Sequence, residues 1–243
     1  MTVTLAWLPA RLVERTEQTT TARTLVFAVP GWPGHLPGQH VDVRLTADDG
    51  YQAVRSYSLA APADDDRLEL GVQPVPDGEV SPYLADQLPP DAEVEMRGPL
   101  GNWFVWQPEQ TQSALLVAGG SGVVPLVAMI RAHHAAGSPS LFQLIYSVRT
   151  PEDIWYREDL TSAGPHFHSQ IIHTRRTPQG DSTRAPGRIT TADLEQATTR
   201  LEPQSPVYVC GPTGFVETAS DLLTELLDKQ GIDPTTIRTE RFG

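Results

Sequence analysis

The hydrophobic pattern of the chain changes near residue 114, and this change limits the folds open to it. Residues 114–118 form a continuous apolar run, which is typical of a parallel strand covered on both faces. A glycine-rich turn follows at 119–122, and a helical pattern then extends to Gly137. A strand, a glycine turn and a helix in this order indicate an α/β domain. They also present backbone N–H groups to an anion, although many such turns need glycine for geometry alone.

The first hundred residues have a different pattern. Four short runs with strand character are separated by Gly, Pro and Asp turns, at 24–29, 40–45, 68–72 and 91–97. This spacing predicts an antiparallel barrel or sandwich, and we expect the barrel. The polar segment 108–113 is the best candidate for a linker. We therefore expect a β-barrel domain at 1–108 and an α/β domain at 109–243.

Further apolar strands and a long helix follow the glycine turn. The strands are expected at 141–148, 167–174 and 207–212, and an amphipathic helix at 215–230 ends before Gly231, a favoured C-terminal residue. Strands that alternate with helices predict a doubly wound, mostly parallel sheet.

Charge and cysteine content exclude several classes of function. The net charge of −12 argues against nucleic acid or an anionic membrane as partner. The single cysteine, Cys210, excludes an intramolecular disulfide framework and a four-cysteine iron–sulfur cluster within this chain. With neither a signal-peptide pattern nor a long apolar run, we expect a cytoplasmic location. We also expect a monomer. No metal site is expected, and all seven histidines are expected on the solvated surface.

The segment 55–60 combines a cation, a ring and two hydroxyl groups. In an extended strand Arg55 and Tyr57 share one side, while Ser56 and Ser58 share the other. Arginine binds phosphate bidentately, and a tyrosine ring stacks on flat ring systems. Phosphate plus flat ring describes a flavin nucleotide, although an ordinary strand end is the simpler interpretation of this segment alone.

A second candidate phosphate segment begins at Gly78. A loop there leads into a short helix, with Ser81 as expected N-cap and Pro82 at the first helical position. A helix N-terminus preceded by a flexible glycine can hold a phosphate. A well-capped surface helix explains the same residues equally well.

Six motifs follow one another along the chain: Arg55-x-Tyr57-Ser58, Gly78-x-x-Ser81, Gly98-Pro99-x-Gly101, Gly119-Gly120-Ser121-Gly122-x-x-Pro125, Cys210-Gly211-Pro212 and Glu240-Arg241-Phe242-Gly243. In this order they resemble the ferredoxin–NADP⁺ reductase superfamily, whose members join an FAD- or FMN-binding barrel to an NAD(P)-binding α/β domain. The resemblance covers nearly the whole chain. One departure is Pro125, which stands where a G-x-G-x-x-G fingerprint has its third glycine.

The resemblance implies roles for the residues of the barrel and of the C-terminus. Arg55 would bind the flavin pyrophosphate, and Tyr57 would stack on the isoalloxazine ring. Ser58 would hydrogen-bond near flavin N5, and Ser56 belongs to the same segment. The remaining flavin contacts would come from Gly78, Val80 and Ser81 at the phosphates, from Phe242 over the second face of the ring, and from Glu240 in proton and electron transfer.

The resemblance also implies a nicotinamide site. Its pyrophosphate would lie on Gly120, Ser121 and Gly122, and its ring beside Cys210, Gly211 and Pro212. Cys210 would act there as a compact wall. A preference for NADPH over NADH is expected from three arginines that follow strands or turns, Arg149, Arg175 and Arg188. Two acidic residues shortly after Arg149, Glu152 and Asp153, argue for NADH.

These roles together predict an NAD(P)H-dependent flavoprotein reductase. Two separated phosphate segments favour FAD over FMN. The electrons would pass to a separate protein, for which ferredoxin or flavodoxin is the leading expectation. The alternatives are an oxygenase component or other multi-component redox enzyme, a non-catalytic electron-transfer subunit of a larger complex, and a flavin-free nucleotide-binding regulator.

Overall fold

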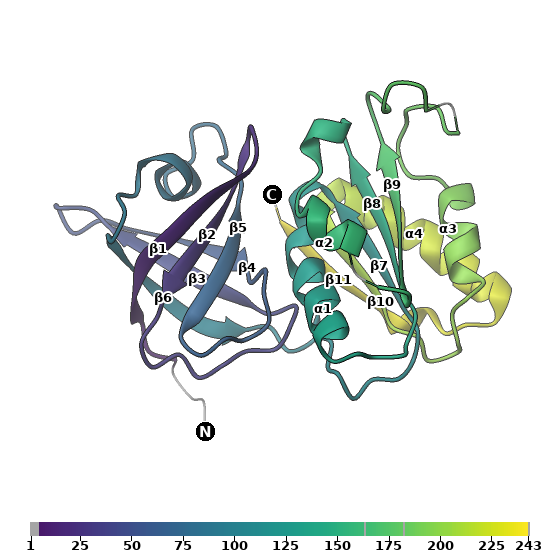
Figure 1. Cartoon of the computed structure of the whole chain (residues 1–243), viewed down its shortest axis with the longest axis horizontal. Coiled ribbons are helices and arrows are strands. Elements are labelled where there is room, and N and C mark those ends of the chain that lie inside the picture. Colours follow the sequence, from purple (N-terminus) through teal and green to yellow (C-terminus); the bar gives the residue numbers. More distant parts are fainter. Residues whose placement is uncertain (1–4, 163, 182, 243) are drawn as a thin grey trace.

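The computed structural model, which describes residues 5–162, 164–181 and 183–242, has two lobes (Figure 1). A six-stranded antiparallel sheet forms the first lobe, and a five-stranded parallel sheet with helices forms the second. The predicted fold class is therefore confirmed. Gly243, the last residue of the terminal motif, lies outside the described residues. The domain boundary at 108/109 stays a prediction.

The first sheet closes into a barrel. Its strands are β1 (Leu8–Thr19), β2 (Ala22–Ala28), β3 (His40–Thr46), β4 (Gln52–Ser58), β5 (Arg67–Val72) and β6 (Glu93–Leu100), and their order is β4-β3-β6-β1-β2-β5. The two edges meet just after β4, where Leu59 bridges Leu70 and the Ala60 N–H donates to the Glu69 carbonyl at 2.8 Å. Edge closure leaves no free strand edge at this point.

The second sheet is doubly wound. Its strands are β7 (Ala114–Gly119), β8 (Phe142–Val148), β9 (Phe167–His173), β10 (Val207–Pro212) and β11 (Ile237–Phe242), in the order β11-β10-β7-β8-β9. Its helices are α1 (Val123–Ala135), α2 (Arg157–Ser162), α3 (Thr191–Thr198) and α4 (Thr213–Gln230). Figure 1 shows α1 and α2 in front of the sheet and α3 and α4 behind it.

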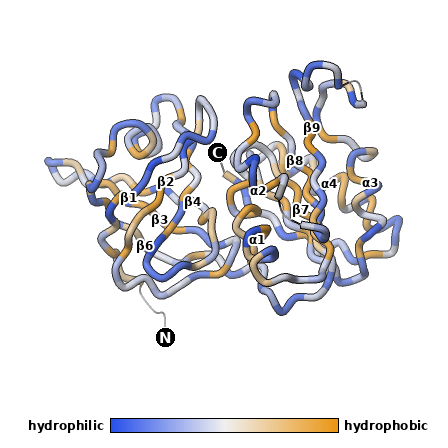
Figure 2. Tube along the Cα trace, viewed as in Figure 1, coloured by the Kyte–Doolittle hydropathy of each residue, from blue (hydrophilic) through white to orange (hydrophobic). Residues whose placement is uncertain are grey.

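Two hydrophobic cores on opposite faces of this sheet explain the continuous apolar runs. Leu116 packs in the cluster that contains the buried face of α1. Its neighbours Leu115 and Val117 pack in the cluster that contains α3 and α4. Every residue of β7 and β8 is buried, and both strands are largely hydrophobic in Figure 2. A two-sided core thus replaces the alternating pattern of the barrel strands.

Two local expectations were wrong. Ser81 does not cap a helix: its Oγ accepts a hydrogen bond from the Val75 N–H at 3.0 Å, and the π-helical turn η1 (Tyr83–Gln87) follows Pro82 without a side-chain cap. The histidines are not all on the surface, since His133 and His173 are buried. His133 stacks on Phe142 and contacts the Ser140 carbonyl oxygen through Nε2 at 2.8 Å. None of the described helices is long and apolar enough to cross a bilayer.

Candidate functional site

Arg55 lies near the end of β4 and is accessible to an anion. Its side chain is 58% exposed, and its nearest acidic partner, Glu79, lies 3.8 Å away. Tyr57, two residues along the same strand, packs against the barrel core. Burial raises the pKa of Tyr57 to about 12, so this ring is a neutral stacking surface.

The loop at Gly78 lies beside the same strand. Glu79 reaches the Arg55 guanidinium, and the Ser81 side chain interacts with the Tyr57 hydroxyl. Val80 is buried and anchors the loop in the barrel core. The structure therefore brings together the two segments that the sequence predicted for the flavin phosphates.

The two serines of the segment have different surroundings. Ser56 Oγ donates to Asp42 Oδ1 at 2.7 Å, and Arg97 Nη2 donates to Asp42 Oδ2 at 2.6 Å. Burial alone would raise the pKa of Asp42, but the bonds to Arg97 and Ser56 outweigh it and lower that pKa. The Ser56 hydroxyl is thus held by the barrel. Ser58 has no side-chain partner among the described residues and remains available to a ligand.

The glycine turn η2 (Gly120–Gly122) separates β7 from α1. Gly120 has φ 54°, and a Cβ added there would meet nothing within 4 Å, so the space over this residue is open. A Cβ at Gly122 would lie 2.2 Å from the Cys210 carbonyl oxygen. Ser121 is half-buried between them. One side of the turn is therefore packed tightly on β10, and the other can receive a pyrophosphate at the N-terminus of α1.

The C-terminal segment, which the sequence presented as a tail, forms the edge strand β11. Its parallel register places Glu240 beside Cys210 and Phe242 beside Pro212. Cys210 is fully buried, and burial followed by the nearby Glu240 carboxylate raises the pKa of its thiol well above the ordinary value. A neutral thiol suits the predicted role as a wall. Phe242 is 38% exposed.

His40 connects this strand to the barrel, and the sequence reasoning missed it. His40 Nδ1 lies 3.4 Å from Glu240 Oε1, and His40 pairs with Ser58 in the register of β3 and β4. Glu240 Oε2 is buried and has no hydrogen-bond partner in the described part of the chain. Ser58 neighbours His40, His40 neighbours Glu240, and Glu240 neighbours Cys210. These contacts connect the end of β4 to β10, and Glu240 Oε2 can still accept a hydrogen bond there.

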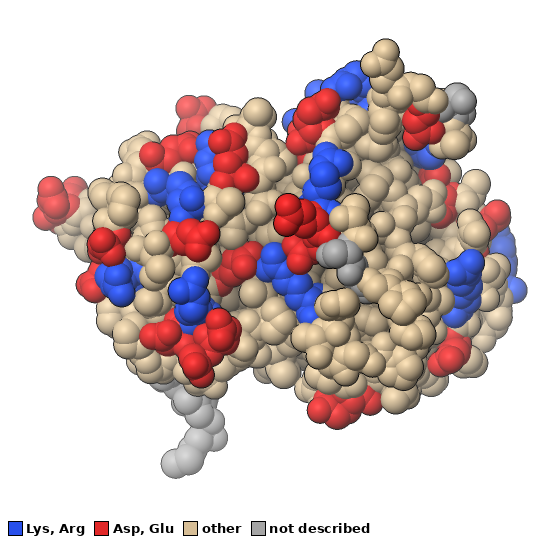
Figure 3. All heavy atoms as spheres, in the orientation of Figure 1, with Lys and Arg blue, Asp and Glu red and all other residues tan. Residues whose placement is uncertain are grey.

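The three arginines predicted for a 2′-phosphate lie on loops at the carboxyl ends of β8 and β9. The Arg175 N–H donates to the Arg149 carbonyl at 2.9 Å, and the Gly187 N–H donates to the His173 carbonyl at 3.1 Å, which places Arg188 close to the end of β9. All three side chains are exposed, and none forms an ion pair with another described residue. In Figure 3, basic side chains stand at the end of this domain, above β9.

The two acidic residues after Arg149 are already engaged. Glu152 pairs with Arg176. Asp153 Oδ2 accepts from the Thr150 N–H and hydroxyl, each at 2.9 Å. Each carboxylate therefore already uses one oxygen within the protein, and Arg176 offsets the charge of Glu152.

A cavity of about 750 Å³ lies beside the Gly78 loop, and neither Arg55 nor Tyr57 lines it. Its lining includes Gly78 but also four carboxylates, those of Asp48, Glu79, Glu93 and Glu95. Carboxylates repel phosphate, so this cavity is a poor place for the flavin diphosphate. No group of three or more His, Cys, Asp or Glu residues in the described ranges could hold a metal ion.

Comparison with known proteins finds a family match for each of the two domains. Residues 9–105 match the model of the oxidoreductase FAD-binding domain, and residues 116–221 match that of the oxidoreductase NAD-binding domain. The chain belongs to the ferredoxin–NADP⁺ reductase superfamily. The family predicted from the six motifs is therefore confirmed.

Two curated members of this superfamily are similar over 96% of this chain, each at 29% identity. One is the glycine betaine monooxygenase reductase subunit of Chromohalobacter salexigens. The other is the ferredoxin–NAD(P)⁺ reductase component of the naphthalene 1,2-dioxygenase/salicylate 5-hydroxylase systems of a Ralstonia species. The chain spans 63% of the first relative and 70% of the second.

The ferredoxin–NADP⁺ reductase of Neisseria gonorrhoeae, solved with bound FAD and NADP, has the same fold. The TM-score is 0.78 at 20% identity, and the match covers 97% of this chain and 98% of that one. Within the superfamily, the open turn at Gly120, the accessible Arg55 and the unpartnered Glu240 oxygen are features that fit two bound nucleotides.

Proposed function

We propose that this chain is a reductase that takes hydride from NAD(P)H onto bound FAD and passes the electrons to a separate redox protein. The observation that carries the proposal is the meeting of two motifs from different domains. Ser58 at the end of β4 and Cys210 at the end of β10 are linked by His40 and Glu240, with 3.4 Å between the last two side chains. Two ring systems held by these strands would face each other there.

The bound flavin would supply the hydride-accepting and electron-donating chemistry. On the barrel side, Arg55 and the loop from Gly78 to Ser81 would hold the diphosphate, while Tyr57 packs against a ring and Ser58 donates a hydrogen bond. Two phosphate segments that are separate in the sequence and side by side in the structure support FAD. These residues orient one ring system and shield it from water.

On the nucleotide side, Gly120, Ser121 and Gly122 would bind the pyrophosphate at the start of α1. The buried Cys210 would limit how far the nicotinamide can move, with Gly211 and Pro212 forming the adjoining turn. Glu240 would face the same ring, where a carboxylate stabilises the positive charge that the ring gains as hydride leaves. Phe242, beside Pro212, is proposed as the cover of the second flavin face.

NADPH is the proposed donor. The exposed side chains of Arg149, Arg175 and Arg188 lie on adjacent loops beyond β8 and β9, where a 2′-phosphate would need cations. The pairing of Glu152 with Arg176 and the bonds from Thr150 to Asp153 weaken the case for NADH that these two acidic residues make.

The proposed acceptor is a ferredoxin or the terminal component of an oxygenase system. The names of both curated relatives place them in oxygenase systems, and the name of the Ralstonia relative also contains the word ferredoxin. Residues 1–108 hold 15 acidic residues against 7 arginines, so docking of an acidic ferredoxin would need a local basic face.

The experiment starts from the purified chain. Acid release and mass measurement identify the cofactor, and anaerobic titration with NADPH or NADH then follows the loss of flavin absorbance. We expect to recover FAD, and we expect about one equivalent of nucleotide per bound flavin to abolish the flavin absorbance. Absence of flavin, or a flavin that neither nucleotide reduces, would refute the proposed function.

A further inference from the structure

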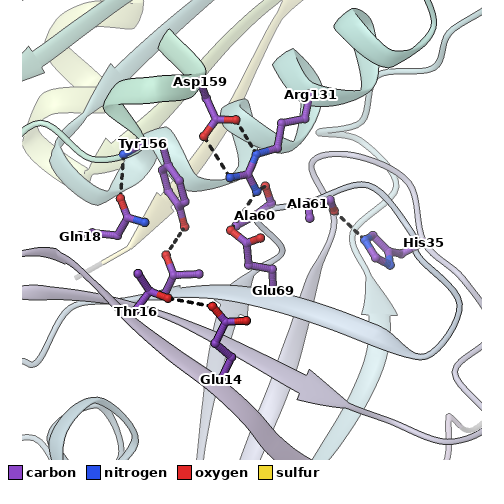
Figure 4. A network of polar contacts seen from close by, with 11 residues as sticks. Glu14, Thr16, Gln18, His35, Ala60, Ala61, Glu69, Arg131, Tyr156 and Asp159 are labelled. Atoms are coloured by element: carbon purple, nitrogen blue, oxygen red, sulfur yellow. Dashed lines mark hydrogen bonds and ion pairs between the residues drawn. The ribbon is translucent and has the colours of Figure 1, made fainter. Parts of the chain in front are cut away.

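Arg131, near the end of α1, binds three acceptor groups, two of which lie across the domain boundary. Its Nη1 donates to the Ala60 carbonyl at 3.0 Å and to Glu69 Oε1 at 2.8 Å, both in the barrel domain. Its Nε and Nη2 donate to the two carboxylate oxygens of Asp159 on α2, at 2.8 and 3.0 Å. Figure 4 shows the guanidinium between these groups. One partly buried side chain thus joins α1, α2 and the closure point of the barrel.

Tyr156 extends the same contact. Its ring lies under the Arg131 guanidinium, 5.1 Å from centroid to Cζ, and its hydroxyl lies 3.4 Å from Thr24 Oγ1 on β2. Its N–H donates to Gln18 Oε1 on β1 at 3.0 Å. Tyr156 has φ 52°, a conformation that persists only where surrounding contacts impose it. The barrel and the nucleotide domain are therefore held together by side chains from both.

The barrel segment that Arg131 grips is also fixed from its other side. His35 Nε2 lies 2.9 Å from the Ala61 carbonyl oxygen, and Trp32 Nε1 donates to His35 Nδ1 at 3.1 Å. Ala60 and Ala61 come directly after the strand end that carries Ser58. A displacement of Arg131 relative to this segment is therefore a displacement of α1 relative to Ser58.

Helix α1 begins at the glycine turn that is proposed to bind the nicotinamide nucleotide. We propose that Arg131 is a positioning residue, which sets the distance between the two cofactor rings by fixing α1 against the end of β4. This inference rests on the proposed function. Hydride transfer needs reacting atoms about 3–3.5 Å apart, and a displacement of about 1 Å can cost on the order of 100-fold in rate.

Truncation of Arg131 would leave Glu69 and Asp159 facing each other without a cation, and uncompensated partly buried charges move apart. The test compares Arg131→Met and Arg131→Lys with Arg44→Met. Arg44 forms a matched bidentate pair with Glu95, at 2.8 and 2.6 Å, within the barrel alone. Each variant is loaded with flavin and mixed with NADPH under stopped flow, and the rate constant is taken per bound flavin.

We expect Arg131→Met to lower the rate constant by about tenfold or more, with the dissociation constant for NADP⁺ within about threefold of the parent. The long-wavelength charge-transfer absorbance that stacked nicotinamide and flavin give should weaken in parallel. The rate constant of Arg131→Lys should lie between those of the parent and Arg131→Met, because an ammonium group cannot reach both carboxylates and the carbonyl at once.

A rate constant for Arg131→Met within about twofold of the parent, or an equal fall in Arg44→Met, overturns the inference. If Arg131→Met does not fold, Tyr156→Phe takes its place, because it removes only the hydroxyl next to Thr24. A fall of about threefold or more in its rate constant supports the inference, and an unchanged rate constant overturns it. A parent chain that neither nucleotide reduces would refute the proposed function instead.

Discussion

His40 Nδ1 and Glu240 Oε1 lie 3.4 Å apart, although they belong to different domains and stand far apart in the sequence. This contact and the one between Arg131 and Ala60 flank the strand end at Ser58. The two proposed cofactor half-sites are thus joined by side chains on both sides of the point where the rings would meet. Catalysis in such a site depends on alignment more than on acid–base groups.

Glu240 supplies the carboxyl group of that contact, and its replacement by an amide should slow hydride transfer. Glu240→Gln keeps the shape but removes the charge that would stabilise the oxidised nicotinamide. We expect the rate constant for flavin reduction to fall by about tenfold, the equivalent of a charged contact worth about 1.5 kcal/mol. Stopped-flow reduction by NADPH measures it. Glu217→Gln, an exposed acid 3.8 Å from Arg241, is the control, and an equal effect in both would contradict this role.

Gly122 should not tolerate a methyl group. A Cβ there would lie 2.2 Å from the Cys210 carbonyl oxygen, and backbone cannot move aside without disturbing β10. We expect Gly122→Ala to reduce the free energy of unfolding by about 1–3 kcal/mol and to weaken NADP⁺ binding. Gly214→Ala is the control, because a Cβ there meets nothing within 4 Å and alanine favours the helix. Denaturant unfolding that shows both variants equally stable would refute the expected clash.

Local patterns predicted much of this fold. The apolar run at 114–118 indicated a two-sided strand because helices cover both faces, and Gly231 marked the end of α4 with φ 70°. Strand β1 was missed because its outward side is largely polar, while among its first residues only Ala10 and Leu12 are fully buried. A half-buried strand of this kind gives a weak signal.

The sequence alone could not predict contacts between residues that are far apart along the chain. Strand β11 exists because β10 offers it a parallel edge, and nothing within residues 237–242 marks that partner. His40 resembles any strand histidine until Glu240 is placed beside it. Arg131 is one arginine on a helical pattern, and its acceptors come from three separate segments. Motif order indicated which residues are expected to bind cofactors, whereas tertiary structure is needed to find the residues proposed to align them.

The buried thiol of Cys210 should make the protein lose stability in mild alkali. Burial raises its pKa in the folded state, whereas the unfolded chain ionises near the ordinary value of about 8.5. Stability is therefore complete below that pH, and above it unfolding releases a proton, so the free energy of unfolding falls as pH rises. Denaturant unfolding between about pH 8 and pH 9.5 should show a smaller fall for Cys210→Ala than for the parent. Parallel curves would show that the thiol does not contribute.

Nucleotide preference gives the sharpest test of the arginine cluster formed by Arg149, Arg175 and Arg188. Arg149 and Arg175 are tied to each other through their backbones at 2.9 Å, and both side chains lie free of ion pairs with other described residues. A 2′-phosphate would complete this arrangement, and loss of one charged contact costs about 1.5–3 kcal/mol.

We therefore expect Arg149→Ala and Arg175→Ala each to lower kcat/KM for NADPH by about tenfold or more and to leave the value for NADH nearly unchanged. Arg200→Ala, at an exposed position after α3, is the control and should alter neither value. An arginine that binds only the 2′-phosphate acts before the rings meet, so its removal should change KM more than kcat. Equal losses for both nucleotides would place these arginines in general support of the loops, and a parent that prefers NADH would contradict the proposed donor.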